Sequence, residues 1–380
     1  MKKKEIANLI KKAEQGDSDA QFNLGRMYDL GKGIKQDFEK AFYWFQKAAE
    51  DNNPSALFGL GVMYYFGDGI EQDNEKAFYW FHEAAEQGFP NAQFNLGNMY
   101  KNGKGIEQDN EKAIYWYQKA AEQGVPDAQF NLALMYDFGD VIEQDYEKAF
   151  YWYQKAAEQN YAPAQFNLGV MYKKGEQIKQ DYEKAFYWYQ KAAELGHTDA
   201  QFNLGNMYAK GEGIEQNIEK AVYWYQKAAE QGDSDAQFNL GLMYDLGEVI
   251  KQDYKKAVFW YEKAAELGHT DAQYNLGVMY ENGKGIEQDY QKAFYWYQKA
   301  AEQNYASAQF NLGYMYYFGN GIEQDYEKAF YWFQKAAEQN YAPAQYNLSV
   351  MYKNGEGTEQ DYEKAAYWYQ KSQEHMKNKE

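Results

Sequence analysis

Apolar residues recur at helical spacing in two segments of the first fifty residues. Ala20, Leu24 and Met27 share one face of a helix at about 19–30. A second segment, at about 37–50, carries a wider apolar stripe at i, i+3, i+4, i+7 and i+8. Its members are Ala41, Trp44, Phe45, Ala48 and Ala49. The pattern therefore predicts two amphipathic helices that bury these faces against each other.

This pair of segments recurs ten times without an insertion. The alanine at the head of the first helix returns every 36 residues, at Ala20, Ala56, Ala92, Ala128, Ala164, Ala200, Ala236, Ala272, Ala308 and Ala344. A fixed period of this length is typical of a solenoid. We predict one array of ten repeats over 16–374, an N-terminal capping half-repeat helix at 1–15 and a disordered tail at 375–380.

Residues at the predicted helix ends agree with this interpretation. A glycine follows each first helix, as Gly31 does, and an Asp or Asn precedes each second helix, as Asp37 and Asn217 do. The turn back to the next repeat carries only Gly or Asn, the residues that tolerate a left-handed backbone. These positions are Gly16, Asn52, Gly88, Gly124, Asn160, Gly196, Gly232, Gly268, Asn304 and Asn340.

The repeat resembles the Sel1-like repeat, a relative of the tetratricopeptide repeat with a longer turn. The matching residues in the second copy are Ala56, Leu60, Gly61, Tyr64, Gly67, Gly69, Ile70, Asp73, Lys76, Ala77, Trp80, Phe81, Ala84, Ala85 and Gly88. The departures are Ala133 and Ser349 for the helix glycine, and Val141, Gln177 and Val249 for the second turn glycine. The resemblance implies an all-α, right-handed superhelical α-solenoid that binds other proteins as a scaffold or adaptor. Some relatives face a host cell, and some carry a β-lactamase-like label.

Composition and charge narrow the classes of partner. The chain has no cysteine and a net charge of −18, so we expect a protein or peptide partner with a basic or neutral surface and no nucleic acid. No apolar run is long enough to insert into a membrane. The start, MKKKEIANLIKKAEQGD, has no apolar core of a signal peptide. We therefore expect a cytoplasmic protein, with secretion by a route other than Sec left open.

The sequence contains no recognisable catalytic or metal-binding motif. No serine stands in a Ser-x-x-Lys or Gly-x-Ser-x-Gly motif. The segment from Gly97 to Gly105 has the wrong spacing for a phosphate loop. His197 and His269 lie two repeats apart, too far to share a metal, and we expect both to be exposed turn residues. We predict no enzymatic activity, no cofactor and no metal, and keep a hydrolase only as an alternative.

The ten tryptophans stand one per repeat on the predicted buried stripe, so we expect them to form the core. The opposite side of each first helix is the more informative surface. At the position of Arg26, seven of ten repeats carry an apolar residue, and an asparagine recurs beside it. A solvated face would be more polar. The asparagines between the ends of the array are Asn95, Asn131, Asn167, Asn203, Asn239, Asn275 and Asn311.

Two interpretations of this first-helix face remain open. In one, the aromatic residues pack between helices and the asparagines bond within the array. In the other, apolar pockets flanked by amides hold an extended segment of a partner in a concave groove. Two aromatic patches would anchor it: Val62, Tyr65 and Phe66 in the second repeat, and Tyr314, Tyr317 and Phe318 in the ninth. A host-interaction factor with the same fold is the alternative function.

Overall fold

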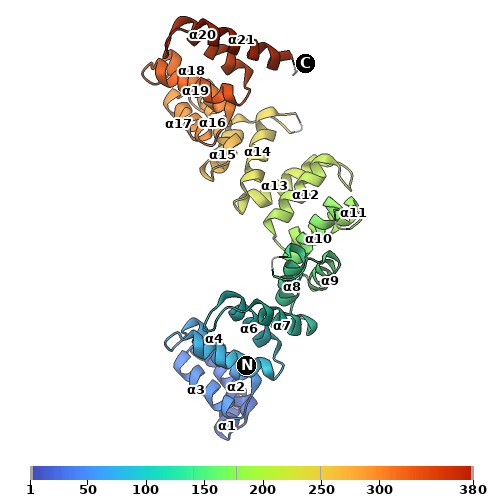
Figure 1. The fold of residues 1–380 in the computed structure, drawn as a ribbon. Coiled ribbons are helices and arrows are strands. Elements are labelled where there is room, and N and C mark those ends of the chain that lie inside the picture. Colours follow the sequence, from blue (N-terminus) through green and yellow to red (C-terminus); the bar gives the residue numbers. More distant parts are fainter. Residues whose placement is uncertain (1–2, 140, 177, 249, 378–380) are drawn as a thin grey trace. The chain divides into compact units, whose positions relative to one another are not determined.

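The described residues form helices joined by short turns. The computed structural model describes residues 3–139, 141–176, 178–248 and 250–377, which form 21 helices and no strand. The chain divides into two compact units, 1–195 and 196–380. Within each unit, helices that follow one another in sequence pack side by side (Figure 1). The predicted all-α repeat fold is confirmed.

Each repeat contributes two helices of 13 residues, except that the last helix, α21, has 16. Their starts agree with the predicted ones to within a residue or two. The first unit contains α1 (Lys3–Glu14), α2 (Ser18–Leu30), α3 (Phe38–Glu50), α4 (Pro54–Phe66), α5 (Asn74–Glu86), α6 (Pro90–Asn102), α7 (Asn110–Glu122), α8 (Pro126–Phe138), α9 (Tyr146–Glu158), α10 (Ala162–Lys174) and α11 (Tyr182–Glu194). The second contains α12 (Thr198–Lys210), α13 (Ile218–Glu230), α14 (Ser234–Leu246), α15 (Tyr254–Glu266), α16 (Thr270–Asn282), α17 (Tyr290–Glu302), α18 (Ala306–Phe318), α19 (Tyr326–Glu338), α20 (Ala342–Asn354) and α21 (Tyr362–Lys377).

Local chemistry explains why the helices begin and end where they do. The side chain of Asp37 accepts a hydrogen bond from the Lys40 amide and caps α3. Gly31 ends α2 with φ of +65°, in the left-handed region that glycine enters freely. Asn160, in the turn between repeats, has φ of +61°. All ten turn positions that the sequence pattern singled out have positive φ, so the predicted turn geometry is confirmed.

In the first nine repeats the core is organised around the aromatic residue that follows the tryptophan, whereas its counterpart in the tenth, Tyr369, is half-exposed. Tyr117 on α7 is fully buried, and its ring lies against the backbone of Gly97 on α6. A Cβ at Gly97 would stand 2.8 Å from the Tyr117 ring, closer than carbon atoms pack. Glycine at this position therefore lets the two helices approach. The fourth repeat has Ala133 here, and α8 remains a continuous helix.

The prediction that the tryptophans form the core is wrong for most repeats. Trp116 is buried, but the others, such as Trp152, are only half-buried and pack against the edge of the core. Consecutive helix residues point about 100° apart. The structure turns the second helix so that the residue after the tryptophan points more directly inward, and in the repeats that carry the helix glycine its ring lies against that glycine.

A buried glutamine of each first helix ties neighbouring repeats together. The Gln93 side chain donates through Nε2 to the Ala85 carbonyl of the preceding second helix, at 3.2 Å. Gln123 at the end of α7 in turn donates to Gln93 Oε1, at 2.8 Å. The same pair of bonds recurs at Gln129, which receives a bond from Gln159. Buried amides placed in this way satisfy helix-end carbonyls and set the register between repeats.

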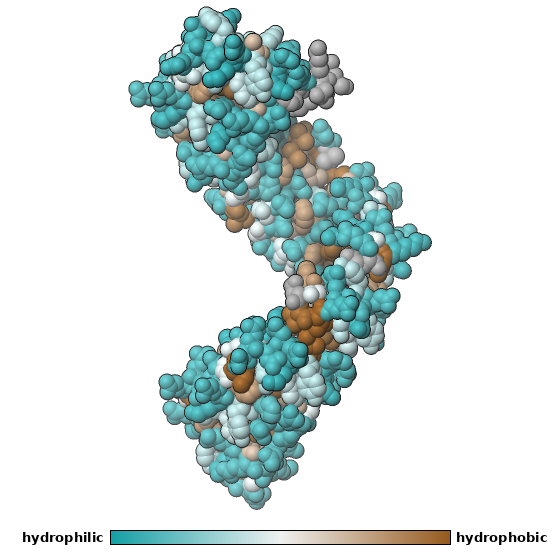
Figure 2. All heavy atoms as spheres, viewed as in Figure 1, coloured by the Kyte–Doolittle hydropathy of each residue, from teal (hydrophilic) through white to brown (hydrophobic). Residues whose placement is uncertain are grey.

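The C-terminal tail and the turns that lack the second glycine need separate comment. Helix α21 continues to Lys377, so it includes the first three residues of the predicted tail. Gln177 and Val249 lie outside the described residues, whereas Val141 lies in an exposed turn. No described helix is long and apolar enough to cross a membrane. Figure 2 shows a mostly hydrophilic surface on which apolar side chains gather in small separate patches.

Candidate partner-binding surface

A hollow on the first-helix face of the second and third repeats collects the predicted N-terminal anchor residues. The repeat-2 hollow, as we name it, lies between α4 and α6 and measures about 80 Å³. Its lining residues are Val62, Tyr65, Phe66, Phe81, Asn95 and Asn98. The Phe66 ring is 66% exposed and stands edge-on to Tyr65, with 5.0 Å between ring centroids. Phe81 of α5 is buried and forms the floor.

An equivalent hollow collects the predicted C-terminal anchors. This repeat-9 hollow lies between α18 and α20 and measures about 260 Å³. It is lined by Tyr314, Tyr317, Phe318, Phe333, Tyr346, Asn347 and Val350. Each residue of the repeat-2 hollow has its counterpart here seven repeats later. Tyr314 and Phe318 are 40% and 53% exposed, and their ring centroids lie 4.4 Å apart. The structure thus brings each predicted anchor triad together in one hollow.

The charged residue at the rim distinguishes the two hollows. Lys104 lies beside the repeat-2 hollow, where its Nζ is 3.0 Å from the Tyr65 hydroxyl and 4.8 Å from the ring centroid. Its counterpart at the repeat-9 hollow is Glu356, whose Oε2 accepts a hydrogen bond from the Tyr317 hydroxyl at 2.8 Å. Burial and this hydrogen bond raise the pKa of Tyr317 to about 12. The two hollows therefore have similar walls but opposite rim charges.

In the six repeats between these hollows the floor residue is a tyrosine, and in five of them its hydroxyl donates a hydrogen bond within the array. The Tyr117 hydroxyl donates to Asn98 Oδ1 at 2.6 Å, and the Tyr225 hydroxyl donates to Asn206 Oδ1 at 2.8 Å. In other repeats the acceptor is a carboxylate, as for Tyr297, which donates to Glu281 Oε2 at 2.6 Å. Burial raises the pKa of these hydroxyls, to about 12 for Tyr225.

The asparagines that recur on the first helices, Asn95 to Asn311, form what we call the asparagine column, and most of them contact the same hydroxyls from the following repeat. Hydrogen bonds from the asparagine amides act against the upward pKa shift of the buried tyrosines, and the asparagines concerned are Asn131, Asn167, Asn239, Asn275 and Asn311. Asn203 instead donates to the Asp199 carbonyl within α12, at 2.9 Å. These contacts are the kind that the packing interpretation expects. Whether the same amides also contact a partner stays a prediction.

The two aromatic hollows lie where this tyrosine is replaced. Phe81 and Phe333 have no hydroxyl, so Asn95 and Asn347 lack the tyrosine contact that Asn131, Asn167, Asn239, Asn275 and Asn311 have. Both asparagines instead line the hollows. The sequence shows the replacement, because Phe stands at the floor position in only three of the ten repeats. Its consequence depends on the contact between the floor residue of one repeat and the asparagine of the next, which the sequence alone does not show.

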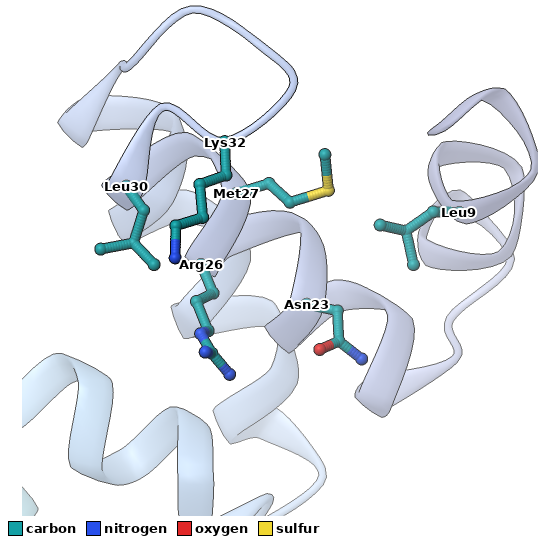
Figure 3. A pocket seen from close by; sticks show the side chains of 6 residues that line it. All are labelled: Leu9, Asn23, Arg26, Met27, Leu30 and Lys32. Carbon is teal, nitrogen blue, oxygen red and sulfur yellow. The ribbon is translucent and has the colours of Figure 1, made fainter. Parts of the chain in front are cut away.

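Two more hollows lie on the same face. One, of about 380 Å³, lies between α8 and α10 and includes Asn167 together with Phe138 and Lys174. The other, of about 420 Å³, lies between α1 and α2 (Figure 3). It is lined by Leu9, Asn23, Arg26, Met27, Leu30 and Lys32. Leu9 stands at the floor position that Phe81 and Phe333 occupy in the later repeats.

The two turn histidines are structural rather than simply exposed, which corrects the expectation. His197 and His269 cap α12 and α16, each accepting a hydrogen bond through Nδ1 from a helix amide. The His269 ring stacks on Phe238 with 4.5 Å between centroids, and its side chain is only 13% exposed. Among the residues that the structure describes, no group of three or more His, Asp or Glu side chains is placed to hold a metal.

Sequence reasoning overlooked an exposed aromatic column on the second helices. The residue before each tryptophan is aromatic in every repeat, as Tyr151 is, and about half of its surface is exposed. The Tyr151 ring lies edge-on to Trp152 with centroids 4.9 Å apart, and Lys155 Nζ lies 5.7 Å from its centroid. The periodicity of exposed aromatics was the available signal. These side chains form a second surface on which a partner could be tested.

The sequence pattern of the Sel1 repeat matches ten consecutive segments: 18–53, 54–89, 90–125, 126–161, 162–197, 198–233, 234–269, 270–305, 306–341 and 342–372. The chain belongs to the Sel1-repeat family. Ten matches cover nearly the whole chain, and they coincide with the helix pairs described above. A search of curated proteins found no match.

Two solved Sel1-repeat structures are similar over most of the chain. One is c5321, described as a protective antigen present in uropathogenic Escherichia coli strains. It is 34% identical, with a TM-score of 0.76 and coverage of 98% of this chain and 90% of c5321. The other is a Sel1 repeat protein from Oxalobacter formigenes, 35% identical, with a TM-score of 0.63 and coverage of 81% and 89%. Both support the fold and the family.

Proposed function

We propose that this Sel1-repeat protein is a non-catalytic scaffold that holds a partner polypeptide on its first-helix face. The observation that carries the proposal is the pair of aromatic hollows with Phe81 and Phe333 as floors. Each combines exposed aromatic rings with an asparagine amide that is free of the tyrosine contact. Aromatic side chains supply large contact area at low entropic cost, and an amide can bond an extended backbone through both donor and acceptor.

The rims suggest what each hollow prefers. Lys104 would favour an apolar side chain that stands next to a carboxylate in the partner, whereas Glu356 would favour one next to a basic residue. The net charge of −18 would add long-range attraction toward a partner with a basic or neutral surface. Association should therefore slow as the salt concentration rises. The asparagines from Asn131 to Asn311 would contribute less, because the array already uses their amides.

Paired alanine variants test the proposal once affinity capture with the full chain and mass spectrometry have identified a partner. Tyr65→Ala with Phe66→Ala should weaken binding by about 2 kcal/mol or more, and Tyr317→Ala with Phe318→Ala should do the same. Helical circular dichroism should change little, because Phe66 and Phe318 are largely exposed and Tyr65 and Tyr317 lie at the partly buried edge of the core.

Matched controls separate this face from other surfaces. Asn203→Ala and Asn239→Ala should each cost less binding energy than either aromatic pair. Tyr151→Ala on the second-helix column should cost none. If both aromatic pairs bind as the wild type does and Tyr151→Ala is impaired, the partner docks on the second helices and the proposal fails.

A host-interaction factor is a second candidate function, with the same non-catalytic chemistry. It is favoured by the similarity to c5321, which is described as a protective antigen. We propose a cytoplasmic location. A host-interaction factor would instead be exported by a route other than Sec. Fractionation of cells and culture medium distinguishes the two locations. Turnover of a β-lactam by the purified chain would argue for the hydrolase alternative against both, and we expect none.

A further inference from the structure

Arg26 of α2 is the only arginine in the 380 residues, since the other 38 basic side chains are lysines. Its side chain is exposed on the first-helix face. No described residue forms an ion pair with Arg26 or with Lys32, although Asp29 stands only three positions along the same helix. Many lysines of the second helices, such as Lys40 with Asp37, do form such pairs. Two cations without partners in so acidic a protein are available to an anionic ligand.

The geometry around Arg26 combines these cations with an apolar wall. The hollow between α1 and α2 has a volume of about 420 Å³, within the range of small-ligand sites. Figure 3 shows Leu9 of α1 facing Met27 and Asn23 of α2 across the open space, with Arg26, Leu30 and Lys32 beyond Met27 on the α2 side. Leu30 is 47% exposed, so apolar surface stands next to the guanidinium. We name this site the arginine hollow.

The charge of this part of the chain differs from that of the rest. Residues 1–35 contain eight basic and five acidic side chains, whereas the whole chain has a net charge of −18. An anion that approaches the later repeats meets a field of its own sign, and near α1 and α2 it meets an excess of positive charge. The local charge is therefore complementary to a carboxylate.

We infer that the arginine hollow binds the C-terminal carboxylate of a partner polypeptide whose last side chain is large and apolar. Arg26 would donate two parallel hydrogen bonds to the carboxylate, as its planar fork permits, and Lys32 would add a second positive charge. The terminal side chain packs against Leu9, Met27 and Leu30. The Asn23 amide, equivalent to Asn95 of the repeat-2 hollow, bonds the preceding peptide group.

A chain terminus fits this arrangement better than an internal acidic residue. Arg26 and Leu30 are four positions apart on α2, so they are neighbours on its surface, with about 5–6 Å between their Cβ atoms. A C-terminal residue carries its carboxylate and its side chain on the same Cα and can meet both. In an extended internal segment, an acidic side chain and its apolar neighbour point to opposite sides.

The lone arginine also supplies the test, because it yields a single Nε–H cross-peak in the ¹⁵N spectrum of the full-length protein. The probe is N-acetyl-leucyl-leucine with a free carboxylate. Its C-terminal amide is the matched control, and N-acetyl-leucyl-glutamyl-leucinamide presents an internal carboxylate. We expect the free acid to shift the arginine cross-peak saturably, the amide to leave it unchanged, and the internal glutamate to need about tenfold more peptide.

Variants check that the shift reports the hollow. Binding of the free acid is followed by the methionine methyl resonances, Met27 among them. It should weaken about tenfold in Arg26→Gln and measurably in Leu30→Ser, but not in Lys101→Gln, which removes a cation from the equivalent turn of α6. An unmoved arginine cross-peak, equal shifts with acid and amide, or unchanged binding in Arg26→Gln overturns the inference. Tyr65→Ala with Phe66→Ala should not affect this probe, so the outcome is independent of the proposed function.

Discussion

Three consecutive aromatic residues on α9 provide the strictest test of how a repeat is held together. Tyr151 is half-exposed, Trp152 is half-buried, and Tyr153 is fully buried against the core of its repeat. Each can be replaced by alanine in the same helix, so that the change in helix propensity is nearly the same at the three positions. Burial is then the main difference among the three variants.

The expected costs follow from what each ring contacts. Tyr153 lies 5.8 Å from the Phe130 ring between centroids, and its hydroxyl donates to Asp137 Oδ2 at 3.0 Å. Its loss should lower the free energy of unfolding by about 3–5 kcal/mol, the usual range for a buried large aromatic. The half-buried Trp152 should cost roughly 2 kcal/mol in proportion to its buried area. Tyr151→Ala should cost less than about 1 kcal/mol.

Urea unfolding followed by far-UV circular dichroism measures the three costs. Hydrogen exchange of the α9 amides shows whether the loss is local to that repeat, as expected for an array in which contacts are between neighbours. Tyr153→Phe isolates the hydroxyl and should cost about 1 kcal/mol, because Asp137 keeps its contact with water. If Trp152→Ala is the most destabilising of the three, the tyrosine is not the centre of the core and our description of the repeat is wrong.

Three further predictions concern stability. Burial raises the pKa of Tyr225 in the folded state to about 12 from the usual 10.0. Its contribution to stability is therefore complete below pH 10 and is lost as the pH rises towards 12. Urea titrations at stepped pH should show the free energy of unfolding falling over that interval. Asn160 has φ of +61°, so Asn160→Ala should cost about 1 kcal/mol whereas Asn160→Gly should cost almost nothing, as compared by thermal unfolding. Removal of residues 90–161, two whole repeats, should leave a folded and shorter protein, and loss of helical circular dichroism per residue would contradict the nearest-neighbour view.

The local half of this structure could be predicted from the sequence. The 36-residue period, the two helices of each repeat and their ends all depend on residues close in the chain. Asp37 caps α3 and Gly31 ends α2 because backbone conformation and capping bonds are set within a few residues. For the same reason Asn160 was predictable as a left-handed residue. The triads of Tyr65 and of Tyr317 were also predictable as patches, since Val62 and Tyr314 each stand three and four positions before the two aromatic residues, spacings at which helix side chains are neighbours.

What only the tertiary structure decided is which side chains meet between helices. Sequence periodicity placed Trp152 and Tyr153 on one broad stripe, and it could not rank them, because the angle at which one helix packs against the next decides which points inward. That packing selects Tyr153, and in the repeats with the helix glycine the close approach of the first helix makes the same selection. The same packing places the hydroxyl of a buried floor tyrosine beside residues of the first helices. Phe81 and Phe333, which have no hydroxyl to place there, leave hollows that no reading of a single helix could reveal.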